Sequence, residues 1–336
     1  MSDHILFAHS LNGATPGSEL TGQAVADSLE APELAWVHMN AGDPATAAWI
    51  ETHMSYLPLA VRHALVADAT RPRVSFHGDG AMIFLRGLNT NPGSEPEDMV
   101  SLRIWIDPAR IVTLSLRQLA AVRELRQSVA DGTGPQDAGT FLADIAARLN
   151  ARIVDRVDVL DDDGERIEQA VLSDEADPGT LRPQITDIRQ ELVDLRRYLR
   201  PQRDALGQLV GDRLSFLEGE ARLELAEQQD VLTRTVEDLE GLSERLLVAR
   251  DEIASAHSDR LNRNLYILSV ISAVFLPLSF LTGLLGINVG GIPGTADGDA
   301  FGKVTAALGG FLVLQVLVLW RMRWVNVPAR WRRQRK

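Results

Sequence analysis

The sequence contains no cysteine among its 336 residues, which excludes disulfides, thiolate metal sites and cysteine nucleophiles. A phosphate-binding loop, a catalytic triad and a carboxylate pair at a meaningful spacing are also missing, so the sequence gives no support to an enzyme. The seven histidines are dispersed, with no HxxxH or HxH pair among them. No covalently bound cofactor is therefore expected.

Negative charge is scarce in the C-terminal part of the chain, although the whole chain carries −12. Residues 260–336 hold ten Lys or Arg and two Asp or Glu, a net of +8, which leaves −20 for residues 1–259. An acidic body argues against nucleic-acid binding, which needs basic surface to meet phosphates. It suits a protein that attracts cations at one end and lies against anionic lipid at the other.

Two uncharged runs predict a membrane hairpin near the C-terminus, whereas the N-terminus lacks the basic and apolar regions of a signal peptide. Leu265–Gly286 is an apolar run of 22 residues. As a helix it would span roughly 33 Å, enough to cross a bilayer core. The second run, Val304–Trp320, is shorter. The span can begin before Val304 if the Lys303 side chain reaches outward to the membrane surface. The predicted segments are transmembrane helices at 265–286 and 303–321, a loop at 287–302 and a basic tail at 322–336.

Basic residues set the expected orientation of this hairpin. Arg260 and Arg263 precede the first span, and seven Lys or Arg follow the second. The loop region between the spans holds only Lys303 together with Asp297 and Asp299. The positive-inside rule places both termini in the cytoplasm and the loop outside, with its two acidic residues.

The first predicted span carries a stripe of polar and small residues. At about 100° per residue, seven positions fall within one sector of roughly 100°, named here the polar sector. These are Asn262, Leu265, Ser269, Ser272, Leu276, Ser279 and Gly283. Small and hydroxylated residues can mediate helix packing in membranes, or their hydroxyls can line an ion path. The stripe alone leaves both explanations open.

The same face continues upstream along a proline-free helical pattern, so one helix is predicted over 216–286. There it meets three carboxylates, named here the acidic lane: Asp251, Glu244 and Glu240. Each carboxylate alone fits a solvated coiled-coil face, but the lane and the polar sector together favour an ion path. Two helices cannot enclose a pore, so several subunits would each contribute a first span.

Residues 1–130 are predicted to form a mixed α/β domain, followed by a long helical hairpin at 138–215. The acidic run Asp161–Gly164 is similar to the start of a calcium loop, but it lacks the alternating spacing and the distal glutamate. It lies within a helical pattern, so a solvated charge run is favoured. The expected strands are His4–His9, Leu34–Met39, Arg73–Phe76, Ala81–Leu88, Val100–Ile106 and Ile111–Leu116.

The stretch Phe275–Asn288 (FLPLSFLTGLLGIN) resembles the CorA family of divalent-cation transporters, which carry F-x-P-L-[ST]-F and a G-x-N loop after the first of two C-terminal spans. The continuation Val289–Gly294 (VGGIPG) is similar to the ZntB branch, in which aromatic residues flanking the loop motif are absent. Arg196–Leu206 (RRYLRPQRDAL) and Ala35–Pro44 (AWVHMNAGDP) also resemble that branch. The similarity covers nearly the whole chain.

The resemblance implies a CorA-like fold: an α/β cytoplasmic funnel domain, long stalk helices and a two-helix hairpin in the bacterial inner membrane, assembled as a homopentamer. It implies Zn²⁺ as the transported ion, with proton coupling left open, and Gly286, Ile287 and Asn288 as the external selectivity loop. It also adds Leu268 to the pore lining, at the edge of the polar sector, and places Asp251 at the cytoplasmic end. The alternatives are a CorA-type Mg²⁺ or Co²⁺ channel and a membrane-tethered sensor that transports nothing.

Overall fold

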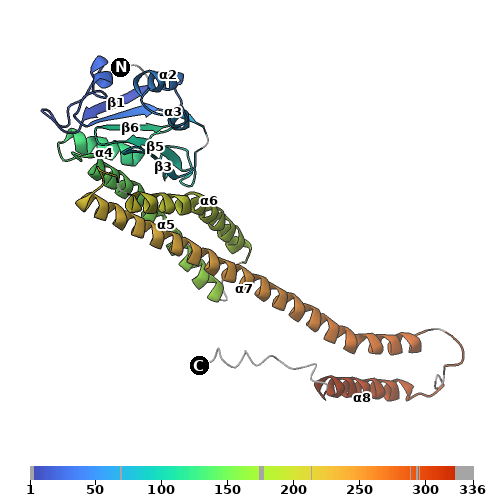
Figure 1. The fold of residues 1–336 in the computed structure, drawn as a ribbon. Helices are drawn as coiled ribbons and strands as arrows, with labels where there is room; N and C mark the ends of the chain where they lie inside the picture. Colours follow the sequence, from blue (N-terminus) through green and yellow to red (C-terminus); the bar gives the residue numbers. More distant parts are fainter. Residues whose placement is uncertain are drawn as a thin grey trace. The chain divides into compact units, whose positions relative to one another are not determined.

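A computed structural model gives the fold and divides the chain into two units, Met1–Asp251 and Glu252–Lys336 (Figure 1). The structure describes residues 4–68, 70–173, 178–212, 214–287, 289–292, 294 and 296–321.

The first unit is built on a six-stranded sheet in the order β1-β2-β6-β5-β4-β3. Strand β2 pairs parallel with β6, and every other neighbouring pair is antiparallel. The parallel pair lies where the chain returns to the sheet after the β3–β4–β5 meander. The strands are β1 (Ile5–Ser10), β2 (Ala35–Asn40), β3 (Arg73–His77), β4 (Gly80–Gly87), β5 (Val100–Ile106) and β6 (Arg110–Ser115).

All six predicted strands are confirmed, with ends that differ by at most one residue. Between β2 and β3 the chain forms two helices, α2 (Pro44–His53) and α3 (Leu59–Val66). Pro58 is the N-cap of α3. Because proline has no N–H and its ring clashes with the preceding helical turn, one continuous helix cannot run through this position. The sequence-based reading missed the short α1 (Gln23–Asp27) and α4 (Ala120–Ala130).

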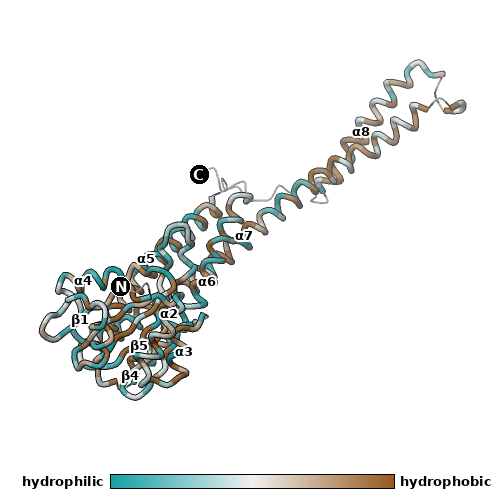
Figure 2. The backbone as a smooth tube through the Cα atoms, turned by 90° about the horizontal axis from the view of Figure 1, so that it is seen from above, coloured by the Kyte–Doolittle hydropathy of each residue, from teal (hydrophilic) through white to brown (hydrophobic). Residues whose placement is uncertain are grey.

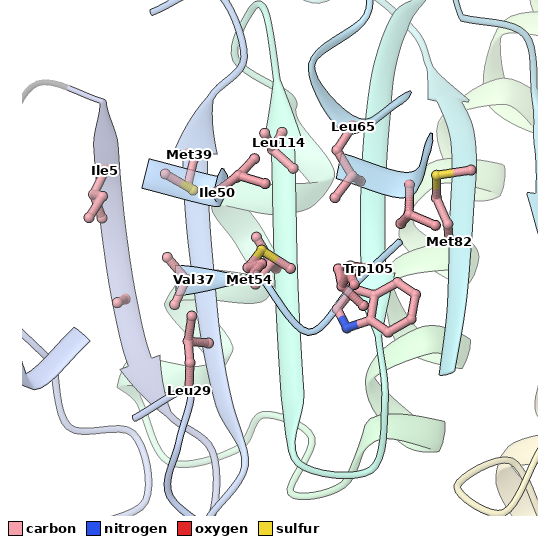
Figure 3. Packing of buried hydrophobic residues seen from close by; sticks show 14 of the residues in the cluster. Ile5, Leu29, Val37, Met39, Ile50, Met54, Leu65, Met82, Trp105 and Leu114 are labelled. Carbon is pink, nitrogen blue, oxygen red and sulfur yellow. The ribbon is translucent and has the colours of Figure 1, made fainter. Parts of the chain in front are cut away.

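Helices cover both faces of the sheet, which explains why β5 is buried at every position and does not alternate. One face forms a cluster with α2 and α3 (Figure 3). The residues labelled there on the strands are Ile5, Val37, Met39, Met82, Trp105 and Leu114, and they meet Ile50, Met54 and Leu65.

The other face of the sheet carries the long helix α5 (Ala138–Leu172). Trp36 of β2 meets Phe141 of α5 edge to face, with ring centroids 5.0 Å apart. Gly87 of β4 lets α5 come close, because a Cβ there would lie 2.6 Å from Leu149 Cδ2. This contact fixes the distance between sheet and helix.

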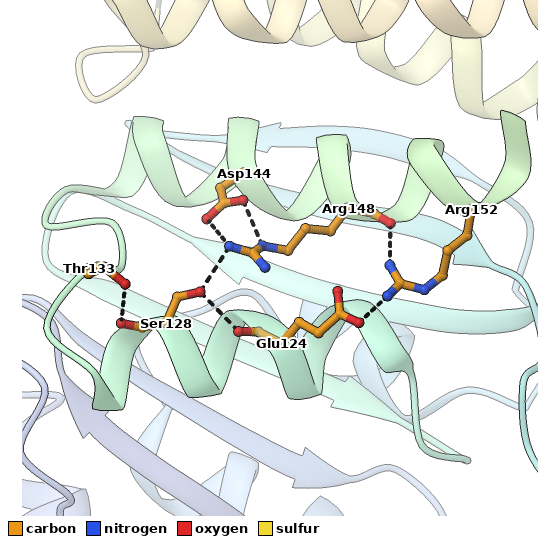
Figure 4. Close-up of polar contacts among 6 residues, drawn as sticks. All are labelled: Glu124, Ser128, Thr133, Asp144, Arg148 and Arg152. Carbon is orange, nitrogen blue, oxygen red and sulfur yellow. Dashed lines mark hydrogen bonds and ion pairs between the residues drawn. The ribbon is translucent and has the colours of Figure 1, made fainter. Parts of the chain in front are cut away.

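Polar contacts join α4 to α5 (Figure 4). Arg148 of α5 donates to Asp144 Oδ1 at 2.7 Å and to Ser128 Oγ of α4 at 3.0 Å. One turn further along α5, Arg152 pairs with Glu124 of α4. The two arginines therefore hold α4 along the length of α5.

Helix α5 then packs with α6 (Pro178–Gly211) and with the first part of α7 (Gly219–Leu285). The acidic run at 161–164 lies inside α5, where Asp162 is exposed and Asp163 pairs with Arg166 of the same helix, as expected of a solvated charge run. Asp161 pairs with Arg245 of α7, and Gly164 faces Leu242, where an added Cβ would lie 2.3 Å from Cδ1. Asp161 and Gly164 therefore contribute to the docking of α7.

The second unit contains the rest of α7 and α8 (Ala300–Arg321). Both helices are long and apolar enough to cross a membrane, and the apolar stretch of each is unburied. Hydrophobic colouring predominates in α8 (Figure 2). The expected fold class, an α/β domain with long helices and a C-terminal apolar hairpin, is confirmed.

Candidate functional site

The polar sector lies wholly on α7, and every one of its residues is exposed in the single chain. Leu265 is 61% exposed and Leu276 is 73% exposed. The added Leu268 is exposed as well. No side chain described in the same unit covers this side of the helix.

Partial shielding of α7 occurs on a different side, at Val270, Val274, Pro277, Leu278 and Leu281. At about 100° per residue this stripe is centred roughly 150° from the middle of the polar sector. Helix α8 has a matching partly shielded stripe at Leu308, Phe311, Gln315 and Leu319. We interpret the two stripes as the faces that the hairpin helices turn to each other, which leaves the polar sector free of α8.

Two hydroxyl groups on α7, one of them in the polar sector, donate their protons to carbonyls of the helix itself. Ser269 Oγ donates to the Leu265 carbonyl at 2.8 Å, and Thr282 Oγ1 donates to the Leu278 carbonyl at 3.0 Å. The hydroxyl oxygens keep lone pairs that can accept a further hydrogen bond. Such oxygens can face the water shell of a cation.

Helix α7 ends just before the expected selectivity loop. The Gly286 amide donates to the carbonyls of Thr282 at 2.9 Å and Gly283 at 3.1 Å, which closes the last turn. The left-handed glycines of this loop are Gly291 (φ 101°) and Gly294 (φ 91°), and Gly286 is not among them. Ile287 is exposed, and Asn288 lies outside the described residues.

The two acidic residues of the loop differ in their surroundings. Asp297 Oδ2 lies 2.5 Å from Lys303 Nζ, and its Oδ1 accepts from the Asp299 amide at 3.0 Å. The Lys303 ammonium, and secondly that amide, hold the pKa of Asp297 below its ordinary value. Among the described residues the Asp299 carboxylate has no ion-pair partner.

The three carboxylates of the acidic lane differ in their ion-pair partners. Glu240 Oε1 accepts from Arg200 Nε of α6 at 2.8 Å, so its charge is already balanced. Asp251 contacts its neighbour Arg250 at 2.8 Å. Glu244 has no ion pair within the part of the chain that the structure describes. Sequence reasoning missed the Arg200 contact, because the two residues are 40 positions apart.

The described residues include no group of three His, Asp or Glu side chains that could hold a metal ion. The candidate site is therefore a row of hydroxyl and leucine side chains along one helix face, with carboxylates before and after it. A row of this kind cannot replace the inner water shell of a divalent cation. It can accept hydrogen bonds from that shell as a hydrated ion passes.

Comparisons with known proteins bear on this geometry. The family described as CorA-like Mg²⁺ transporter protein matches residues 32–325. The chain is 38% identical over 326 residues to "Divalent cation transporter CmaX" of Pseudomonas aeruginosa, covering 96% of this chain and 97% of that one. It is 34% identical to "Zinc transport protein ZntB" of Yersinia pseudotuberculosis, covering 97% and 95%. A solved structure of full-length CmaX superposes with a TM-score of 0.82 at 34% identity, covering 96% and 99%.

Proposed function

Because the chain belongs to the CorA-like transporter family, we propose that it carries hydrated divalent cations across a membrane and that Zn²⁺ is its preferred ion. The observation that carries this proposal is the exposed polar sector of α7, on the side of the helix away from the α8-facing stripe. A row of hydroxyls facing lipid would find no hydrogen-bond partner outside its own helix. Around an oligomer axis, the same row lines a water-filled path.

An oligomer is required because one hairpin cannot enclose a pore. We take the assembly to be a homopentamer in the inner membrane, with both termini in the cytoplasm. Each subunit contributes α7 to the ring, and α8 lies outside it against lipid. The partly shielded stripe on α8 fits this arrangement. The large side chains of α8 outside the stripe, such as Val313 and Leu317, are exposed and would face lipid.

A cation would first meet the loop, where Asn288 forms a ring of amide oxygens and Asp299 supplies unbalanced negative charge. It would then pass the hydroxyls and leucines of the polar sector with its water shell retained. At the cytoplasmic end, Asp251 and Glu244 offer carboxylates to the same hydrated ion. The path carries no fixed charge between Asn264 and Ala296, so it would bind the cation weakly enough for the cation to leave.

The choice of zinc rests on the residues after the loop motif and on the relatives. The sequence Val289–Gly294 resembles the ZntB branch, and Leu285 and Val289 stand where magnesium-transporting members carry aromatic residues. A relative named as a zinc transporter aligns over 97% of the chain. The second candidate is a Mg²⁺ or Co²⁺ channel, favoured by the description of the family.

Uptake of Zn²⁺ and Mg²⁺ into proteoliposomes, with and without an imposed pH gradient, tests the proposal. We expect faster uptake of Zn²⁺, and a dependence on the gradient would establish proton coupling. Asn288→Ala should abolish discrimination by the loop. Uptake of Mg²⁺ alone would favour the second candidate, and uptake of neither ion would leave a tethered sensor.

A further inference from the structure

The soluble part of α7 presents one apolar stripe to α5 and α6. Its residues are at most 5% exposed: Leu232, Val236, Leu239, Leu242, Leu246 and Ala249. Gly164 of α5 brings the two helices close at Leu242. This one-sided stripe limits the rotation of α7 coarsely, because a large rotation would expose apolar side chains, whereas a small rotation changes the buried area little.

Ion pairs to α6 and to α5 stand on opposite sides of that stripe. Glu240 lies about 110° from the middle of the stripe in one direction and Arg245 about 110° in the other. Glu240 is held by Arg200 of α6, with Nε 2.8 Å from Oε1. Arg245 is held by α5, through Asp161 and through Glu168 at 3.3 Å. Rotating α7 in either direction would stretch the ion pairs on one side of the stripe.

These pairs contribute little to the stability of the fold. Their side chains are between 34% and 48% exposed, and exposed ion pairs are weak and screened by salt. A directional contact that adds little stability is suited to setting an orientation. Helix α7 has no proline before Pro277, so a rotation imposed at Glu240 and Arg245 is expected to pass along it.

We propose that Arg200 and Arg245 are positioning residues that set the rotation of α7 about its own axis and so orient the polar sector toward the pore. This inference rests on the proposed function only in taking the polar sector to line the pore. The rotation itself can be measured without transport.

The chain offers matched controls for these two arginines. Arg203 of α6 pairs with Asp204 at 2.8 Å, and Arg234 of α7 pairs with Glu227 at 3.1 Å. Both are exposed arginine–carboxylate pairs, but each lies within one helix. Removing them changes charge by the same amount and loosens no helix from another.

The native chain has no cysteine, so single cysteines report directly. We would introduce Ser258→Cys, in phase with the polar sector, or Ala256→Cys, about 160° away around α7. The rate at which a charged, water-soluble thiol reagent modifies each would be measured in the full chain in proteoliposomes. In Arg200→Gln or Arg245→Gln backgrounds, the ratio of the two rates should change about two- to fivefold, the bias that an exposed ion pair supplies.

Arg203→Gln and Arg234→Gln should leave the ratio unchanged, and exchanging the pair as Arg200→Glu with Glu240→Arg should restore it. Thermal unfolding of each variant would show that the fold is retained. An unchanged ratio in Arg200→Gln and Arg245→Gln would overturn the inference. A changed ratio in a chain that moves no cation would uphold the positioning role and remove the proposed function.

Discussion

Lys303 Nζ lies 2.5 Å from Asp297 Oδ2, and this ion pair joins the first turn of α8 to the loop before it. The pair leaves Asp299 as the unbalanced charge of the loop. The lowered pKa of Asp297 keeps its carboxylate ionised to a lower pH than usual. The attraction to Lys303 is present above the ordinary carboxyl pKa and is lost as the pH falls through the lowered value.

Lys303→Met should therefore lower the KM for cation uptake, because two unbalanced carboxylates then stand at each loop. The effect should fade above about 0.15 M salt, where the screening length is about 8 Å. Asp299→Asn should raise KM under the same conditions. Initial uptake rates at low and high ionic strength provide the measurement, and a KM insensitive to both changes would contradict it.

Gly164→Ala should destabilise the first unit by about 1–3 kcal/mol, because the new methyl group would meet Leu242 in a packed interface. Gly241→Ala is the matched control, since a Cβ there meets nothing within 4 Å on the neighbouring face of α7. That change should stabilise the helix by about 0.5–1 kcal/mol. Chemical unfolding of both variants checks the pair, and equal effects would argue against close packing at Gly164.

His38 should make the first unit sensitive to acid. Its Nδ1 lies 2.8 Å from Thr113 Oγ1 and its ring stacks on Phe7, with no carboxylate against it among the described residues. Burial lowers the pKa of His38 from 6.5 to about 3, and the Arg126 charge acts in the same direction.

The stabilising neutral form of His38 is fully effective above pH 6.5. As the pH falls below that value the unfolded chain binds a proton that the folded one excludes, so stability declines by up to about 1.4 kcal/mol per pH unit. His38→Gln should remove this pH dependence, so the free energy of unfolding of the variant should fall less steeply below pH 6.5 than that of the wild type. Parallel curves for wild type and variant between pH 7 and 4 would show that His38 does not contribute.

The sequence predicted the sheet and the long helices because their signals are local. Hydrophobic runs bounded by Gly, Pro and Asp mark β3 to β6, and the periodic pattern of 138–172 coincides with α5. Contacts between distant residues leave no such signal. No local pattern around Asp161 predicts its contact with Arg245, and none around Gly87 predicts the contact with Leu149, so these docking roles are seen only in the fold.

Within the candidate site, the helical periodicity predicts a face of α7 but not which residues neutralise its carboxylates. The pairing of Glu240 with Arg200 and of Asp297 with Lys303 depends on how α6 and α8 approach their partners. The free carboxylates Glu244 and Asp299 could not be told from the paired ones by spacing. Asn288 stays a prediction from the resemblance, since it lies outside the described residues.

The most direct test of the ion path compares two neighbouring positions on α7. Ser272 lies in the polar sector, whereas Ile271 is about 100° further around the helix and outside it. Zn²⁺ uptake into proteoliposomes would be measured for Ser272→Trp and Ile271→Trp, with equal incorporation verified. The account predicts that the tryptophan at 272 blocks uptake and that the one at 271 leaves it near wild type; full uptake through Ser272→Trp would contradict it.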